Sequence, residues 1–190
     1  MFKKSAVVFL ALLLFCAARS FGEDVNIRFN SKDGIFTMPF GRDYDYSNIK
    51  VKRVIDGDTM QLENGERVRL IGIDTPEIHD SNKLRKDSQR TKQEAEAIKE
   101  MGRQAFAFTR NLVEGKYVSL DFDVERQDKY GRLLAYAYLK DGTFVNAEIV
   151  KQGYASLMTI PPNVKHADLF TKLYREAREN KKGLWSDNSF

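Results

Sequence analysis

Alternating apolar and polar residues in the first half of the chain predict short β-strands joined by tight turns. Three strands are expected there, over residues 51–55, 60–63 and 67–74. The first ends at Asp56-Gly57, and the other two flank Asn64-Gly65, a pair typical of tight hairpin turns. Gly72 in the third strand indicates a bulge or a tight bend. We therefore expect a strand that leads into a hairpin.

The second half of the chain changes to a helical period and then returns to strands. Apolar residues recur at spacings of three and four at Ile98, Met101, Ala105, Phe108 and Leu112. This pattern predicts an amphipathic helix that ends at Gly115. Further strands are expected over 118–122, 133–139 and 154–158, and further helices over 145–152 and 167–182. In the last helix, Leu169, Leu173 and Ala177 share one face.

The order of these elements predicts an α+β fold. Five of these short strands, with a helix inserted between the third and the fourth, suggest a small, partly open barrel, and the oligonucleotide-binding (OB) fold is the obvious candidate. We expect a five-stranded OB barrel with about three packed helices.

The first residues of the chain are typical of an export signal. Lys3 and Lys4 precede an apolar run over residues 6–16, which is too short to span a bilayer, and small residues follow it. We expect a signal peptide over 1–22, a linker over 23–46 and an OB-fold domain over 47–187, in a secreted or periplasmic protein. A lipoprotein acylated at Cys16 ranks second, because bulky Phe15 precedes the cysteine, and an uncleaved anchor ranks third.

Removing the leader changes what the composition implies. The whole chain has 31 basic and 27 acidic residues and a net charge of +4; three basic residues and no acidic ones lie in residues 1–22, which leaves 28 against 27, a net of +1. Overall charge therefore does not argue for nucleic-acid binding. The only cysteine, Cys16, leaves with the leader. Disulfides, a thiol nucleophile and a cysteine-based zinc site are then excluded.

Two acidic clusters lie sixteen residues apart on either side of the predicted hairpin turn. They are Asp56-Gly57-Asp58-Thr59 and Asp74-Thr75-Pro76-Glu77. The hairpin should bring them together, and carboxylates converge on one volume only around positive charge, usually a hard cation with oxygen ligands. Arg69 and Arg132 add guanidinium groups that suit phosphate. Acids for a metal together with arginines for an anion suggest phosphodiester chemistry.

Several stretches, taken in order, resemble the staphylococcal nuclease family over roughly residues 48–187. They are Val54-Ile55-Asp56-Gly57-Asp58-Thr59, Arg69-Leu70-Ile71-Gly72-Ile73-Asp74-Thr75-Pro76-Glu77, Asp128-Lys129-Tyr130-Gly131-Arg132, Val145-Asn146, Gln152-Gly153 and Gly183-Leu184-Trp185-Ser186. The resemblance implies an OB barrel with helices packed on it. It also implies a calcium-dependent phosphodiesterase that hydrolyses DNA and RNA and leaves 3′-phosphate ends.

Matching motif to motif assigns expected roles. Asp58 and Asp74 would give carboxylate oxygens to calcium, and Thr75 its backbone carbonyl. Glu77 would orient or deprotonate the attacking water, and Arg69 and Arg132 would bind the scissile phosphate. Lys129 and Tyr130 are expected to form a turn that also contacts the nucleic acid. We expect a monomer that has no stable membrane association after the signal is cleaved.

Other interpretations remain open at this point. Asp56 is as plausible behind the metal ligands as among them, and His79 and His166 are expected at the surface rather than on zinc. The basic residues between Lys83 and Arg103 form either a solvated face or a contact for a polyanion. A non-catalytic nucleic-acid-binding barrel is the first rival to the nuclease, although such relatives usually lose these acids and arginines. A barrel used for protein contacts in the cell envelope is the second.

The chain also departs from the family pattern. The loop after Glu77 is longer, and Thr159 and Pro161 stand on an ungapped alignment where the prototype has two tyrosines that line the nucleotide pocket. Base stacking at those two positions is therefore not expected.

Overall fold

The computed structural model describes residues 45–76 and 92–186. The expectations for the leader, most of the linker, Glu77, His79 and the basic stretch from Lys83 to Arg90 lie outside the described residues. The described strands are β1 (Ile49–Asp56), β2 (Thr59–Leu62), β3 (Arg67–Leu70), β4 (Gly72–Asp74), β5 (Tyr117–Asp121), β6 (Leu133–Leu139) and β7 (Ser156–Met158). The described helices are α3 (Lys92–Val113), α4 (Val145–Lys151), α5 (Ala167–Glu179) and the short 3₁₀ helix η1 (Gly183–Trp185).

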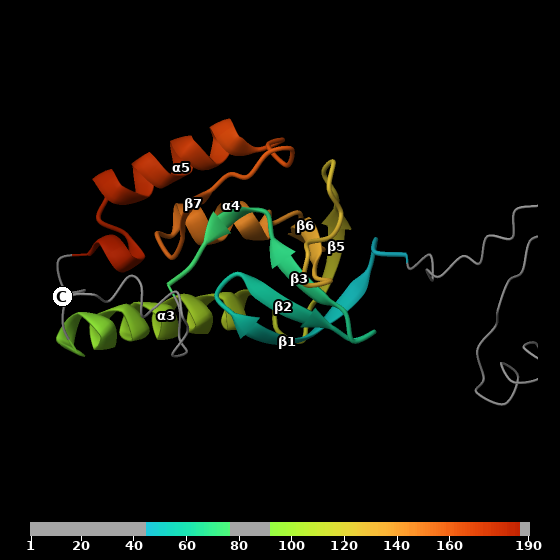
Figure 1. Cartoon of the computed structure of the whole chain (residues 1–190), viewed down its shortest axis with the longest axis horizontal. Helices are drawn as coiled ribbons and strands as arrows, with labels where there is room; N and C mark the ends of the chain where they lie inside the picture. Colours follow the sequence, from blue (N-terminus) through green and yellow to red (C-terminus); the bar gives the residue numbers. More distant parts are fainter. Residues whose placement is uncertain (1–44, 77–91, 187–190) are drawn as a thin grey trace, which may run out of the picture. The chain divides into compact units, whose positions relative to one another are not determined.

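Five of the strands close into a barrel in the order β1-β2-β3-β6-β5 (Figure 1). Every neighbouring pair is antiparallel except β3 and β6, which run parallel. Helix α3 lies in the chain between the third and the fourth barrel strands. The prediction of an α+β fold with an OB barrel is confirmed, and the barrel is closed rather than partly open. The β2–β3 hairpin is also confirmed, with a backbone hydrogen bond from Leu62 to Glu66 across a three-residue loop.

The strand predicted over residues 154–158 lies outside the barrel. Within this range, residues Ser156–Met158 form the strand β7, which pairs with β4 in a separate two-stranded sheet. The chain leaves the barrel at Ile71-Gly72, where Gly72 has a φ of +84°. A Cβ at this position would lie 2.4 Å from the Phe170 ring. Only glycine fits this bend, which carries β4 and its acidic end away from the barrel wall.

The helices pack against one another and against the barrel. Helix α3 contacts β1, and α4 lies between α3 and α5 (Figure 1). The prediction of which face of α5 is buried is partly wrong. Leu169 is 40% exposed, whereas Phe170 and Ala177 are buried. The i, i+4, i+8 spacing of Leu169, Leu173 and Ala177 does not show which of two neighbouring stripes faces the core, and here the large ring of Phe170 decides it. Within residues 45–76 and 92–186, no helix combines the length and the apolar character that crossing a bilayer requires.

Asn146 holds the barrel together at the point where β3 ends. Its side chain is fully buried; Oδ1 accepts a hydrogen bond from the Ala137 backbone N–H at 3.0 Å, and Nδ2 donates to the Ile71 carbonyl at 2.9 Å. Strand β6 continues past the end of β3, so its Ala137 N–H has no partner on β3. The Asn146 side chain accepts this hydrogen bond instead. This contact joins the bend before β4 to the barrel wall.

We predict that Asn146→Leu lowers the free energy of unfolding by about 3 kcal/mol, because two buried backbone groups lose their partners while the volume hardly changes. Urea unfolding of the wild type and the variant measures the difference. The exposed Asn111 provides the control, and Asn111→Leu should cost under about 0.5 kcal/mol. Equal losses in the two variants would contradict this role of Asn146.

His166, which the sequence predicts at the surface, is half-buried. Its imidazole ring packs edge-on against Tyr136, with the ring centroids 4.5 Å apart, and it also contacts Phe144 and Phe170. Burial lowers the pKa of His166, and the positive charge of Lys165 lowers it further, while Asp121 and Asp123 act in the opposite direction. The fold therefore favours the neutral imidazole.

We predict that stability falls as the pH drops below about 6.5, because the unfolded chain then binds a proton that the folded protein resists. The loss should continue down to the lowered folded-state pKa. Denaturation midpoints between pH 7.5 and 5 measure it, and the decline should be smaller in His166→Phe. An identical decline in that variant would show that His166 is not its source.

Candidate catalytic site

The hairpin brings the two acidic clusters together at one end of β1, β2 and β4. Thr59 of β2 pairs with Arg69 of β3, and the Leu70 N–H donates to the Asp58 carbonyl at 2.9 Å. Asp74 ends β4, four residues past the last residue of β3. The convergence of Asp58, Arg69 and Asp74 follows from this register.

The Asp58 carboxylate is buried and fixed by hydroxyl and backbone donors. The residue is 5% exposed; Oδ1 accepts from the Thr59 hydroxyl at 2.9 Å, and Oδ2 accepts from the Thr75 N–H and hydroxyl at 3.0 and 3.1 Å. A Cβ at Gly57 would lie 2.7 Å from the Thr75 hydroxyl oxygen. The glycine therefore allows the loop after β1 to approach Thr75 closely enough for these bonds.

The guanidinium group of Arg69 lies between the carboxylates of Asp58 and Asp74. Nη1 forms an ion pair with Asp58 Oδ2, and Nη2 donates to Asp74 Oδ1 at 2.9 Å. The Arg69 and Asp58 side chains are only 13% and 7% exposed, and that of Asp74 is 19% exposed. Two carboxylates so close together and so poorly solvated need a positive charge between them, and Arg69 supplies it.

Strand β7 adds two contacts that the sequence does not predict. The Ser156 hydroxyl donates to the Asp74 carbonyl at 3.1 Å, and the Met158 sulfur lies 3.8 Å from Arg69 Nη2. Neither residue belongs to a motif or has strong chemistry of its own. Their place beside the carboxylates follows from the β4–β7 pairing, which is non-local.

Arg132 directly precedes the neighbouring strand, β6, and forms an ion pair with Asp128. Leu134 of β6 pairs with Arg69, and Arg132 comes two residues before Leu134 in the chain. Its Nε donates to Asp128 Oδ2 at 2.7 Å, and its side chain is 27% exposed. Arg132 is thus near Arg69 in the strand register, and its ion pair is with Asp128 rather than with Asp58 or Asp74.

Asp128 organises the turn that presents Arg132. Besides the Arg132 side chain, it accepts backbone hydrogen bonds from Tyr130 and Arg132 at 2.9 and 3.0 Å. Burial alone would raise the pKa of Asp128, but these hydrogen bonds and the Arg132 charge outweigh burial and hold the pKa below its ordinary value. An aspartate at the start of a turn that ends in glycine is the local signal for this arrangement.

Lys129 and Tyr130 form the exposed tip of this turn. Tyr130 is 64% exposed, with the Lys129 ammonium 5.1 Å and the Arg132 guanidinium 5.6 Å from its ring centroid. The sequence correctly predicted a turn here. The Tyr130 ring therefore lies outside the hydrophobic core, at the tip of the turn.

The donor set suits a hard cation such as calcium. Carboxylate and carbonyl oxygens from Asp58, Asp74 and Thr75 are the kind of ligand that calcium takes. The guanidinium between the two carboxylates shows that this volume already accommodates positive charge. Among residues 45–76 and 92–186, no group of three or more histidine, cysteine, aspartate or glutamate side chains gathers. Further ligands would come from water, from carbonyl groups or from Glu77, which lies outside the described residues.

Asp56 lies next to this cluster, and one of its oxygens accepts a hydrogen bond from the Gly57 N–H at 2.8 Å. That contact fixes the turn after β1. Thr109 of α3 supports the same turn from behind, because its hydroxyl donates to the Gly57 carbonyl at 2.7 Å.

Comparison with known proteins agrees with this architecture. Residues 67–187 match the family profile described as staphylococcal nuclease homologue. A thermonuclease of Staphylococcus intermedius is 38% identical over 71% of this chain and 74% of its own length. A thermonuclease of Staphylococcus hyicus is 30% identical over 86% of this chain and 90% of its own length. The endonuclease YncB of Bacillus subtilis is 34% identical over 75% of this chain and 64% of its own length. The chain, with its closed barrel and its paired acidic clusters, therefore belongs to the staphylococcal nuclease homologue family.

Proposed function

We propose that this protein is a calcium-dependent nuclease that hydrolyses the phosphodiester bonds of DNA and RNA and leaves 3′-phosphate ends. The arrangement of Arg69 between Asp58 and Asp74 is the observation that carries the proposal. In this arrangement, the carboxylate oxygens that would bind a hard cation are in direct contact with the guanidinium group that would bind phosphate. Family membership and the similarity to thermonucleases and an endonuclease support nuclease activity.

Each residue has a role that its chemistry suits. Asp58, Asp74 and the Thr75 carbonyl would hold calcium, which when bound offsets the negative charge that builds up on the phosphate. Arg69 and Arg132 bind the nonbridging phosphate oxygens, and the planar guanidinium can donate to two of them at once. Glu77 holds or deprotonates the water that adds to phosphorus as the bond to the 5′ oxygen breaks.

The positions of the two arginines suit complementary tasks. Arg69 is largely buried and fixed by both carboxylates, whereas Arg132 is more exposed and has one acidic partner. Arg132 can therefore turn toward a bound phosphate at the cost of a single ion pair. Lys129 and Tyr130, beside it on the turn, would contact the same nucleic-acid strand, and the exposure of the Tyr130 ring supports this role.

The proposal includes export, with residues 1–22 as a signal peptide, so that the mature protein acts outside the cytoplasm as a monomer. The leader pattern of a short basic start, an apolar run and small residues supports this part.

A nuclease assay on the purified mature protein tests the activity itself. A labelled oligonucleotide should be degraded with calcium and spared when a chelator is added. Asp58→Asn should remove the calcium-dependent cleavage, and isothermal titration should show weakened calcium binding, because a buried ligand loses its charge. Intact oligonucleotide with the wild-type protein in calcium would instead favour the rival function, a barrel that binds nucleic acid without cutting it.

We predict that Arg69→Lys and Arg132→Lys each lower turnover by about 100-fold, because an ammonium cannot reproduce the paired donors of a guanidinium. Steady-state kinetics on one short substrate measures turnover, and circular dichroism checks that each variant is folded. Lys151→Arg, on the outer face of α4, is the matched control and should leave turnover unchanged. Wild-type rates in either arginine variant would remove that residue from the mechanism.

A further inference from the structure

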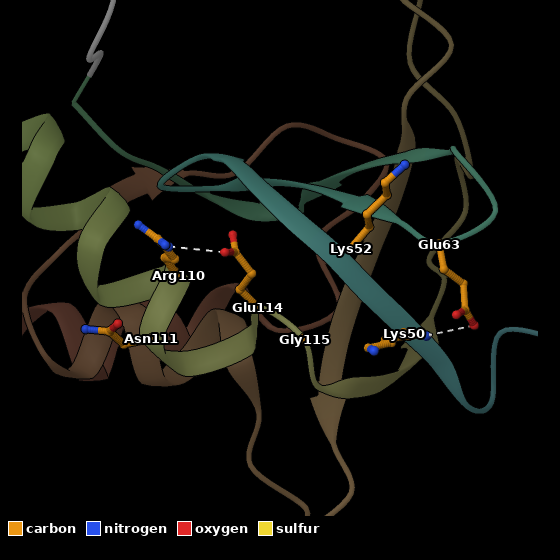
Figure 2. A pocket seen from close by; sticks show the side chains of 7 residues that line it. All are labelled: Lys50, Lys52, Glu63, Arg110, Asn111, Glu114 and Gly115. Atoms are coloured by element: carbon orange, nitrogen blue, oxygen red, sulfur yellow. Dashed lines mark hydrogen bonds and ion pairs between the residues drawn. The ribbon is translucent and has the colours of Figure 1, made fainter.

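A group of cations lies away from the catalytic cluster, on the outer face of β1. Lys50 and Lys52 of β1 and Arg110 of α3 line a hollow of about 790 Å³ (Figure 2). Asn111, Glu114, Gly115 and Glu63 complete its lining. No part of the proposed reaction uses these residues.

The register of β1 explains why the two lysines point outward. Val51 between them is fully buried, and its N–H and carbonyl bond to the Lys116 carbonyl and the Gly115 N–H at 2.8 and 2.9 Å. Side chains alternate along a strand, so Lys50 and Lys52 both face away from the core. The end of α3 approaches from the side and forms the other wall of the hollow (Figure 2).

The two acids in the hollow are already engaged by other groups. Glu114 accepts the Val54 N–H at 2.9 Å and the Arg110 Nε at 3.1 Å. Glu63 accepts the backbone N–H of Lys50, and the Lys50 ammonium points away from that carboxylate (Figure 2). Among the described residues, the ammonium groups of Lys50 and Lys52 form no ion pair with a carboxylate. Both remain available to an external anion.

The cationic surface continues across the barrel with an exposed aromatic ring. Tyr117 of β5 pairs with Lys50 of β1 and is 39% exposed. The Lys140 ammonium, just beyond β6, lies 4.5 Å from the centroid of the Tyr117 ring. Lys50, Lys52, Arg110, Tyr117 and Lys140 together form what we call the β1 patch.

We propose that the β1 patch is a second nucleic-acid contact surface, which binds phosphates of a long substrate at a distance from the bond that is cut. Lysine ammonium groups bind backbone phosphates without reading sequence, and an exposed tyrosine can stack on an unpaired base. A mixed row of lysines and one tyrosine therefore fits a single strand. This inference extends the proposed nuclease function and names a surface that only long substrates use.

The length of β1 sets how long such a substrate must be. Lys50 precedes Asp56 by six residues, which is about 20 Å along a strand. A strand stacked as in duplex DNA, with one phosphate per about 3.4 Å, needs about six nucleotides to cover this distance, and a more extended single strand needs fewer. A dinucleotide bound at the catalytic cluster cannot reach Lys50, but a 30-nucleotide strand can reach the whole patch.

The test compares a variant of the β1 patch with a charge-matched control. Lys50→Gln/Lys52→Gln removes two patch charges, and Lys151→Gln/Lys172→Gln removes two from outer helix faces, where each lysine pairs with a glutamate. Binding of a labelled 30-nucleotide single strand is measured in chelator, so that nothing is cut, over a range of salt concentrations. Cleavage of a dinucleotide in calcium is measured in parallel.

In a plot of the logarithm of the association constant against the logarithm of the salt concentration, Lys50→Gln/Lys52→Gln should make the negative slope shallower by about 1.4, or about 0.7 per lysine. The control variant should keep the wild-type slope. Dinucleotide cleavage should be unchanged in both variants. A wild-type slope in the patch variant, or an equal loss in the control, would overturn the proposal. If neither substrate is cleaved by the wild-type protein, the nuclease assignment fails, but the binding comparison still decides whether the patch contacts nucleic acid.

Discussion

The ion pairs that Arg69 makes with Asp58 and Asp74 are the interaction on which the rest of the site depends. Both carboxylates are largely shielded from water, and a buried charge without a partner is strongly unfavourable. One guanidinium pairs with both carboxylates, which leaves the three side chains with a net negative charge, and it holds their chain segments close together. The same group is a strong donor to phosphate, so one residue links the stability of the site to its proposed chemistry.

This arrangement needs three stretches of chain to meet at one end of the barrel. The turn after β1 presents Asp58, strand β3 presents Arg69, and the end of β4 presents Asp74. The close contact of Gly57 with Thr75 joins the first stretch to the third, and Asn146 ties the bend before β4 to β6. The buried core therefore determines the position of each charge, and no flexible loop is needed to bring Asp58, Arg69 and Asp74 together.

The molecule has two kinds of cation in separate places. Arg69 and Arg132 are tied to acids that orient them, whereas Lys50 and Lys52 extend from an outward strand face without a carboxylate partner among the described residues. Oriented guanidinium groups suit one phosphate at a fixed place. Unpaired lysines suit the diffuse charge of a longer strand, which needs attraction but little geometry.

The sequence by itself determined the elements and the core of the site, because the signals for them are local. Alternation, helical spacing and turn residues gave the strands, the helices and the β2–β3 hairpin, and the hairpin was enough to predict that Asp58, Arg69 and Asp74 meet. Only the tertiary structure decided the separate β4–β7 sheet, the contacts of Ser156 and Met158 at the site, the inward turn of Phe170 on α5 and the aromatic surroundings of His166. These features depend on which distant segments pack together, and that choice is made by the shape of the whole core, which neighbouring residues along the chain do not encode.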